Sequence, residues 1–236
     1  PTTAEKPMEW FTMPKGFSDA LSLPGIPKGY FTGCCGWNST GKSTLKNCLI
    51  ASAQKQGVLP ILFETESNFD FQYAINCGME ATPLMGVDEE TGEEKIIDYE
   101  GNFILFNNEA ICEYCGDMDY STMTRKSTKR KVAVVEDIAY IINDLLDKQE
   151  AGELPVELLF IWDSVGSVGS WKSYTSKAGN NMFDANSISV AFNTIVNTRI
   201  PSSRSQNYPY TNSTELVIYE PKVKQKKKPK IWLACL

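Results

Sequence analysis

The most constraining feature of this chain is the eight-residue stretch "GWNSTGKS" over residues 36–43. It matches the pattern G-x-x-x-x-G-K-[ST], whose glycines let several backbone N–H groups point at one anion. Lys42 would place its charge on the β- and γ-phosphates of a nucleotide, and the Ser43 hydroxyl would ligate Mg²⁺. The alternative is a glycine-rich turn followed by a chance Lys-Ser pair. We predict a phosphate-binding loop that comprises Gly36, Trp37, Asn38, Ser39, Thr40, Gly41, Lys42, Ser43 and Thr44.

The segments around this loop alternate between strand and helix patterns. The run "LLFIW" before Asp163 is continuously apolar, which is typical of a strand buried on both faces of a parallel sheet. Such alternation favours βαβ units, so the sequence predicts an α/β fold with a mostly parallel central sheet and helices on both faces. The predicted strands cover residues 29–35, 58–64, 153–163 and 215–220, and the predicted helices cover 42–56, 68–78, 132–148 and 182–199.

Other segments fall outside this alternation. Residues 1–24 have little periodicity and are interpreted as an N-terminal lead-in to a core over residues 25–236. Within the core, residues 82–131 are interpreted as an insertion. Residues 96–106 predict a β-hairpin with a turn at Glu100–Gly101. The Gly-, Ser- and Asn-rich stretch over 164–181 predicts a loop.

Composition excludes several kinds of function. The chain has no histidine, which removes Ser/His and Cys/His catalysis and histidine metal ligands. The net charge of −6 argues against a generic nucleic-acid coat, although residues 124–131 and 222–230 are basic. No apolar run is long enough to span a membrane, and the first residues do not form a signal peptide. We therefore expect a cytoplasmic protein with no membrane partner.

The seven cysteines are interpreted as reduced thiols. Cys112 and Cys115 form a lone C-x₂-C pair, whereas a structural zinc ion needs four ligands and the sequence has no second pair. Buried or neutral thiols are therefore preferred over a zinc or redox site.

Acidic residues near strand ends are candidates to hold Mg²⁺ or to orient water beside the phosphate loop, because a P-loop lies at the carboxyl edge of its sheet. Asp163 ends the apolar strand and can hold Mg²⁺ through water, although a simple turn residue is the alternative. Glu66 follows the strand over 58–64 and is a candidate to orient the attacking water. Glu64 competes for that role, and spacing alone leaves the choice open.

Three stretches in order resemble the ATPase core of RecA-type recombinases, including phage UvsX-like proteins. "GIPKGYFTGCCGWNSTGKSTL" is similar to the family's entry turn, strand and P-loop, and "LLFIWDSVGSV" to its Asp-Ser-Val motif, which supports Asp163 and Ser164. "ILFETESNFDFQYAINCGM" is similar to the segment that holds the catalytic glutamate, which places Glu66 in that position. The resemblance implies that Asp70 and Tyr73 lie near the adenine, with Tyr73 able to stack on it.

The resemblance also implies a RecA-like P-loop NTPase that binds single-stranded DNA (ssDNA), hydrolyses ATP with Mg²⁺ and self-associates into a filament or ring. Two loops would reach DNA. The first falls near residues 170–182, where Lys172 and Lys177 would meet phosphates and Trp171 or Tyr174 would stack on bases. The second follows the strand over 215–220, where the lysine run over 222–230 begins, and Lys222 and Lys224 are the candidates to contact the DNA backbone. A solvated polar loop and a basic tail are the alternatives for these two segments.

The chain also departs from the family. Where the family has an amide residue that senses the γ-phosphate, this sequence has Glu220-Pro221, so the sensor is absent or the register differs. The chain stops before the family's last core strands, which indicates a truncated protein, a fragment or a divergent relative.

The function that we expect is an ATP-dependent recombinase that exchanges DNA strands in recombination and repair, in the cytoplasm of a bacterial host if it is phage-encoded. One alternative is a RecA-fold replicative helicase or motor. A second alternative is a recombination mediator that binds nucleotide without hydrolysis.

Overall fold

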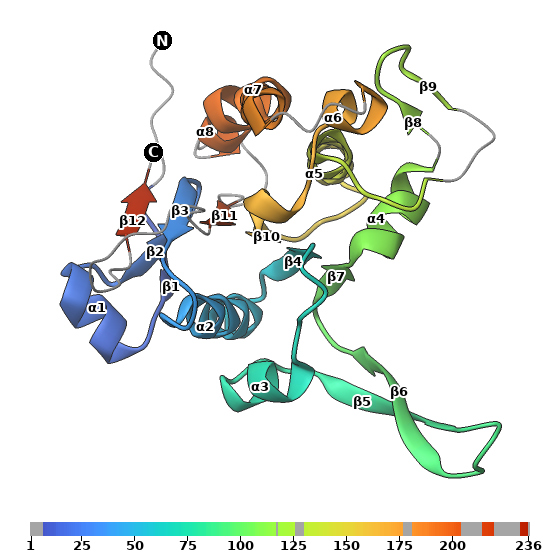
Figure 1. Cartoon of the computed structure of the whole chain (residues 1–236). Coiled ribbons are helices and arrows are strands. Elements are labelled where there is room, and N and C mark those ends of the chain that lie inside the picture. Colours follow the sequence, from blue (N-terminus) through green and yellow to red (C-terminus); the bar gives the residue numbers. More distant parts are fainter. Residues whose placement is uncertain are drawn as a thin grey trace.

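The computed structural model describes residues 7–116, 118–125, 130–176, 181–203, 214–219 and 232–235. At its centre is a sheet in which all neighbouring strands are parallel except one edge strand, which pairs antiparallel (Figure 1). In spatial order the strands are β12 (Trp232–Cys235), β3 (Phe31–Cys35), β11 (Thr214–Tyr219), β10 (Leu158–Asp163), β4 (Leu59–Glu64) and β7 (Ile104–Phe106), with β12 as the antiparallel strand. The prediction of an α/β fold with a mostly parallel central sheet is confirmed.

The continuous apolar run of β10 is explained by burial on both sides. All six of its residues are buried. Successive side chains of a strand point to opposite faces, so Phe160 and Trp162 pack in one hydrophobic cluster and Leu159 and Ile161 in the other. The sheet therefore separates two cores, each of which needs a cover of helices.

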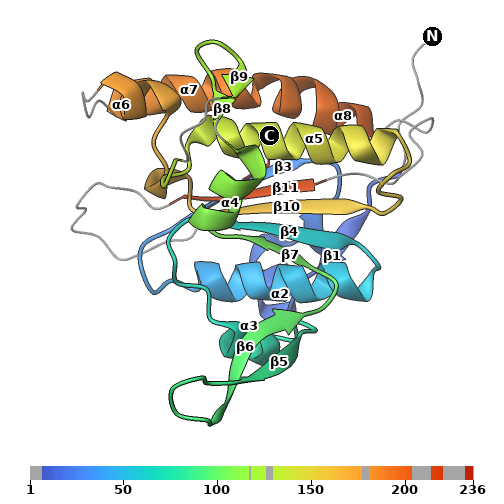
Figure 2. The same ribbon diagram turned by 90° about the vertical axis from the view of Figure 1, so that its right-hand side faces the viewer.

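Helices cover both faces of the sheet, as the sequence predicted (Figure 2). One face carries α2 (Lys42–Lys55), with α3 (Phe71–Asn76) beyond it, and the other carries α5 (Val135–Glu150) and, outside it, α7 (Asn181–Thr194). The chain continues from α7 through the π-helical turn η2 (Ile195–Arg199) into α8 (Ile200–Ser203), and α4 (Asn108–Cys115) packs beside α5. No helix of the described ranges is long and apolar enough to cross a membrane.

The predicted lead-in is structured where it is described. Strand β1 (Trp10–Thr12) pairs antiparallel with β2 (Gly25–Pro27), and α1 (Lys15–Leu21) connects them. Phe11 and Ile26 are fully buried in the cluster on the α2 side of the sheet. Strands of three residues have too short a pattern to be recognised in the sequence.

The predicted hairpin over residues 96–106 is wrong. Strand β6 (Glu94–Glu100) pairs antiparallel with β5 (Thr82–Val87), and the two form a ribbon that projects from the body in Figure 1. Residues 104–106 instead form β7, a parallel neighbour of β4, where Phe106 is buried and stacks on Phe63 with ring centroids 5.5 Å apart. Burial in the central sheet therefore decides the partner of this segment, because a two-stranded hairpin alone would leave it in solvent.

The two ends of the β5–β6 ribbon are joined by one side chain of α2. Gln54 donates from Nε2 to the carbonyl oxygens of Glu80, at 2.9 Å, and Asn102, at 3.2 Å. Its Oε1 accepts from the backbone N–H of Glu80 at 2.8 Å. Gly101 lies between these ends, and a Cβ atom there would stand 2.7 Å from the Glu80 carbonyl oxygen. The ribbon thus starts and finishes at one fixed point on the body.

The predicted loop over residues 164–181 is helical in part. A 3₁₀ turn, η1 (Val165–Ser167), follows β10, and α6 (Trp171–Ser176) precedes α7. Between α4 and α5 lies the short pair β8 (Met118–Asp119) and β9 (Thr124–Arg125). Residues 177–180 lie outside the described part of the chain.

Candidate functional site

The predicted phosphate loop spans the gap between the end of β3 and the start of α2. Gly41 has a φ of 94°, in the left-handed region that favours glycine, and it is the N-cap of α2. The Lys42 side chain turns back over the loop and is buried, and its Nζ donates to the carbonyl oxygens of Gly36, at 2.9 Å, and Trp37, at 2.8 Å. The loop therefore folds around the ammonium group of Lys42, and the helix start adds a positive dipole end beside it.

Two carboxylates lie next to this loop at the carboxyl edge of the sheet. Asp163 and Glu64 end the neighbouring parallel strands β10 and β4, and they stand opposite each other in register. Both side chains are buried. Asp163 accepts from Nζ of Lys46, one turn into α2, at 2.5 Å. No local pattern indicates this pair, because the two residues are 117 positions apart.

The structure distinguishes the two glutamates that competed in the sequence. Glu64 is buried, and its two carboxylate oxygens accept from the backbone N–H groups of Glu66 and Asn68 at 3.3 Å each. Burial raises the pKa of Glu64, while its hydrogen bonds and the charge of Lys46 lower it. Glu66 is exposed, and its Oε1 accepts from the Ser164 hydroxyl. The other oxygen of Glu66, Oε2, accepts from Asn68 Nδ2 at 3.3 Å. The two glutamates therefore differ in burial, because Glu64 is buried and Glu66 is exposed.

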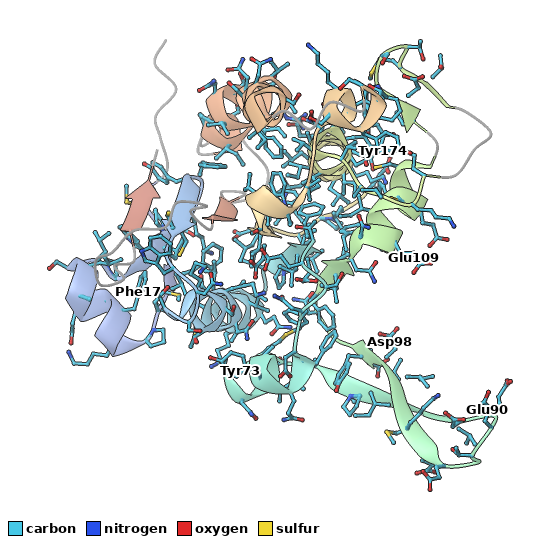
Figure 3. The ribbon with its side chains drawn as sticks, in the orientation of Figure 1. Phe17, Tyr73, Glu90, Asp98, Glu109 and Tyr174 are labelled. Atoms are coloured by element: carbon cyan, nitrogen blue, oxygen red, sulfur yellow. The ribbon has the colours of Figure 1, made fainter. Side chains whose placement is uncertain are left out.

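Asp70 and Tyr73 come from the start of α3. The Asp70 side chain caps this helix by accepting from the backbone N–H of Tyr73 at 2.9 Å. The Tyr73 hydroxyl bonds the hydroxyl of Thr44 in the first turn of α2, and Tyr73 is 40% exposed. Its side chain is labelled in Figure 3. The structure therefore brings Tyr73 to the P-loop helix, while one oxygen of Asp70 is engaged in the cap.

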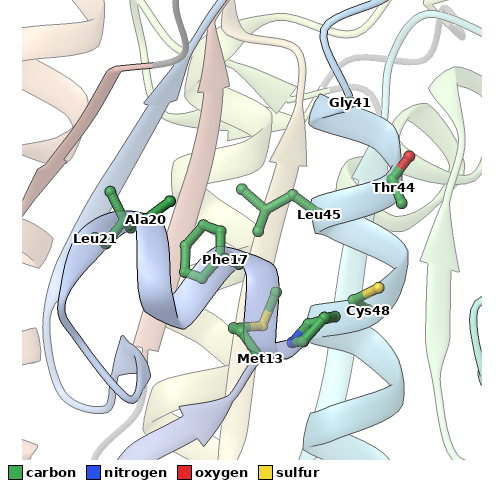
Figure 4. Close-up of a pocket in the computed structure, with 9 residues that line it drawn as sticks. Met13, Phe17, Ala20, Leu21, Gly41, Thr44, Leu45 and Cys48 are labelled. Carbon is green, nitrogen blue, oxygen red and sulfur yellow. The ribbon is translucent and has the colours of Figure 1, made fainter.

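An apolar pocket of about 500 Å³ lies between α1 and the P-loop helix α2 (Figure 4). Phe17 and Leu21 of α1 line it from one wall, and Leu45 and Cys48 of α2 from the other. Gly41 and Thr44 also line it, so it reaches the first turn of α2. The sequence did not indicate this pocket, because its two walls are separate segments of the chain.

The residues at this edge fit a magnesium ion that is held mainly by nucleotide phosphates. Ser43 is exposed at the start of α2, and Asp163 supplies a carboxylate with two oxygens, of which Lys46 uses one. Among the described residues there is no group of three His, Cys, Asp or Glu side chains that could hold a metal ion. Mg²⁺ is usually bound by one or two carboxylates, water and substrate phosphates, and Asp163 and Ser43 are oxygen ligands of the kind that it takes.

The predicted DNA-contacting residues are placed only in part. Lys172 and Tyr174 lie exposed on α6, and Tyr174 is 47% exposed (Figure 3). Trp171 is engaged within the protein: its Nε1 donates to Ser121 Oγ at 2.7 Å. Its ring also lies 5.3 Å from the Arg130 guanidinium. Lys177, Lys222, Lys224 and the expected sensor position at Glu220-Pro221 lie outside the described residues.

The guanidinium of Arg130 belongs to a buried cluster that sequence reasoning missed. Asp137, in the first turn of α5, accepts from Arg130 Nη1 at 2.8 Å and Nη2 at 2.5 Å. It also accepts from the Tyr120 hydroxyl at 2.7 Å and from the backbone N–H of Val134 at 2.8 Å. The cluster connects the segment before α5 to Trp171 at the start of α6.

The C-x₂-C pair lies on α4 with both thiols buried. Burial raises the pKa of Cys112 and of Cys115, and the nearby charge of Asp137 raises both further. Cys115 Sγ donates to the Asp137 carbonyl oxygen at 3.6 Å. A thiol whose pKa is raised in this way is mostly protonated and unreactive at neutral pH.

The fold and the loop together define an α/β protein of the P-loop class with a RecA-like sheet. Comparison with known proteins agrees: the family described as the RecA N-terminal domain matches residues 10–107. Protein RecA of Herpetosiphon aurantiacus is 36% identical over 77 residues, and that of Chlorobaculum tepidum is 38% identical over 77 residues. Protein RecA of Cytophaga hutchinsonii is 36% identical over 81 residues.

These matches support a RecA-like recombinase family for the chain through its N-terminal part. The aligned segments cover 33–34% of this chain and 22–23% of the relatives. The chain thus matches about a fifth of the length of these curated relatives.

Proposed function

We propose that the chain binds ATP at residues 36–44 and hydrolyses it, as the ATPase core of a recombinase that acts on ssDNA. The observation that carries this proposal is that Lys42, Asp163 and Glu66 come from the carboxyl ends, or the segments just after them, of β3, β10 and β4. These are strands of one parallel sheet, and ligands of open α/β sheets bind at that edge. The RecA-like matches support it independently.

Each residue has a definite role in the proposed reaction. Lys42 exchanges its bonds to the loop carbonyls for the β- and γ-phosphates, which neutralises charge that develops during transfer. Ser43 and, through water, Asp163 would hold Mg²⁺, which would supply positive charge to the phosphate oxygens. Tyr73, whose hydroxyl bonds Thr44 in the first turn of α2, and Asp70 would contact the adenine.

The chemical step is an in-line displacement by water. Glu66, which is exposed and oriented by its bond from Ser164, positions the water that attacks the γ-phosphorus. A P–O bond forms to the water oxygen and the bond from the γ-phosphorus to the bridging oxygen breaks, which yields ADP and inorganic phosphate. We assign this role to Glu66 in preference to Glu64 because Glu64 is buried.

The remaining parts of the proposal concern partners and location. Lys172 on α6, with Lys177, Lys222 and Lys224, would contact the ssDNA backbone, and the affinity would fall with salt. Self-association into a filament or ring, strand exchange, a cytoplasmic location and a phage origin complete it.

The proposal is tested by ATP turnover with and without ssDNA. We expect wild-type turnover to rise with ssDNA, Glu66→Gln to bind nucleotide without appreciable turnover, and Lys42→Ala to lose binding. Glu64→Gln is the matched control, because it changes the neighbouring glutamate while leaving the proposed water-orienting carboxylate. A Lys42→Ala protein that keeps full ssDNA-stimulated turnover would refute the site. Wild-type binding without any turnover would favour a mediator.

A further inference from the structure

Lys46 is a lysine that the P-loop pattern does not require. It lies one helical turn beyond Lys42 on α2, and its side chain is 3% exposed. Lysine is almost never fully buried unless it is paired. Lys46 has such a pair in Asp163, at 2.5 Å, and its ammonium group also lies 5.1 Å from the centroid of the Phe69 ring. These contacts fix one ammonium group at the end of β10.

The charges around Lys46 are those that a divalent cation would otherwise balance. Asp163 and Glu64 are buried and opposite each other at the ends of adjacent strands. Two buried carboxylates this close repel each other, and a cation between or beside them relieves that repulsion. Lys46 supplies a positive charge at this point as part of the protein itself.

We propose that Lys46 is a positioning residue that acts as a built-in counter-ion of Asp163, and that it weakens the dependence of nucleotide binding on Mg²⁺. The inference rests on the nucleotide site proposed above. Lys46 holds the Asp163 carboxylate in place without a metal ion, and its charge repels a divalent cation that approaches the same carboxylate. Both effects reduce the coupling free energy between Mg²⁺ binding and nucleotide binding.

A second buried lysine offers a matched control. Lys28 precedes β3 at the opposite, amino edge of the sheet, and its side chain is 6% exposed. It donates to Glu157 Oε2 at 3.1 Å and lies 5.1 Å from the centroid of the Phe11 ring. Lys28 therefore repeats the combination of burial, carboxylate and phenyl ring away from the P-loop.

The test measures how Mg²⁺ changes the affinity for a fluorescent ADP analogue. Affinities are compared in EDTA and in saturating MgCl₂ for wild type, Lys46→Met and Lys28→Met, with far-UV circular dichroism as a check on folding. For wild type and Lys28→Met we expect the affinity in MgCl₂ to exceed that in EDTA by at most about threefold. For Lys46→Met we expect this ratio to be about tenfold or more, within the usual range of coupling between two ligands.

The outcomes separate the inference from the function on which it rests. Equal ratios for the three proteins would overturn the role of Lys46. If Lys46→Met does not fold, the wild-type ratio still decides, because wild-type binding that depends strongly on Mg²⁺ contradicts a built-in counter-ion. Absence of analogue binding in both media would refute the nucleotide site and the inference with it.

Discussion

Replacing Asp137 by asparagine should remove most of the stabilisation that the buried cluster before α5 provides. The Asp137 carboxylate is fully buried and accepts four hydrogen bonds, two of them from the guanidinium of Arg130. Asparagine keeps the shape but not the charge, so the Arg130 side chain, which is 6% exposed, loses its counter-ion. Breaking a buried ion pair by changing one partner costs about 3–5 kcal/mol. That is a large fraction of the roughly 5–15 kcal/mol that stabilises a typical domain.

Urea denaturation followed by far-UV circular dichroism measures this loss. The matched control is Asp147→Asn, which also removes a carboxylate from α5. Asp147 is 67% exposed and lies 2.9 Å from Arg199 Nη2, so its loss should cost about 0–1 kcal/mol. If Asp137→Asn changes the free energy of unfolding by no more than the control does, the cluster does not stabilise the fold as argued.

Three further predictions concern stability and thiol reactivity. Gly101→Ala should destabilise the fold by about 1–3 kcal/mol in the same assay, because the added Cβ would stand 2.7 Å from the Glu80 carbonyl oxygen. Burial raises the pKa of Glu136 from 4.5, so its ionisation destabilises the fold as pH rises. The unfolding free energy of Glu136→Gln should therefore rise relative to that of wild type as the pH is raised from about 4 to about 7. A difference between the two proteins that does not change with pH would contradict this. Burial also raises the pKa of Cys34, to about 11, and that of Cys115. Iodoacetamide at about pH 8 should therefore label both thiols more slowly in the native than in the unfolded protein. Peptide mass spectrometry measures the two labelling rates.

The parts of the fold that the sequence predicts are those with local patterns. The helix after the predicted loop depends on local residues and begins at Lys42, as expected. The continuous apolar run predicts β10, which ends at Asp163 as expected but begins at Leu158 and not at residue 153. The partner of residues 104–106 depends on competition between the central sheet and a hairpin, which no local pattern records.

The same distinction applies to the candidate site. Asp163 was expected at the strand end, and the roles assigned to it and to Glu66 remain predictions. The Lys46–Asp163 pair joins positions 117 apart and arises only when α2 packs on β10. Lys46 does follow Lys42 by four residues, which places both on one helix face, but that spacing does not indicate Asp163 as its partner.

The attachment of the β5–β6 ribbon through Gln54 makes that segment replaceable. Since Glu80 and Asn102 meet at one amide group, the residues between them can lengthen, shorten or diverge without moving the central sheet. Doubling the length of a flexible loop costs only about 0.6 kcal/mol in closure entropy. The position is therefore a natural place to graft a peptide tag or a binding motif, provided that Gln54, Gly101 and Tyr99 are kept. The Tyr99 ring stacks on Phe71 of α3 with centroids 4.1 Å apart, which is a second contact of the ribbon with the body.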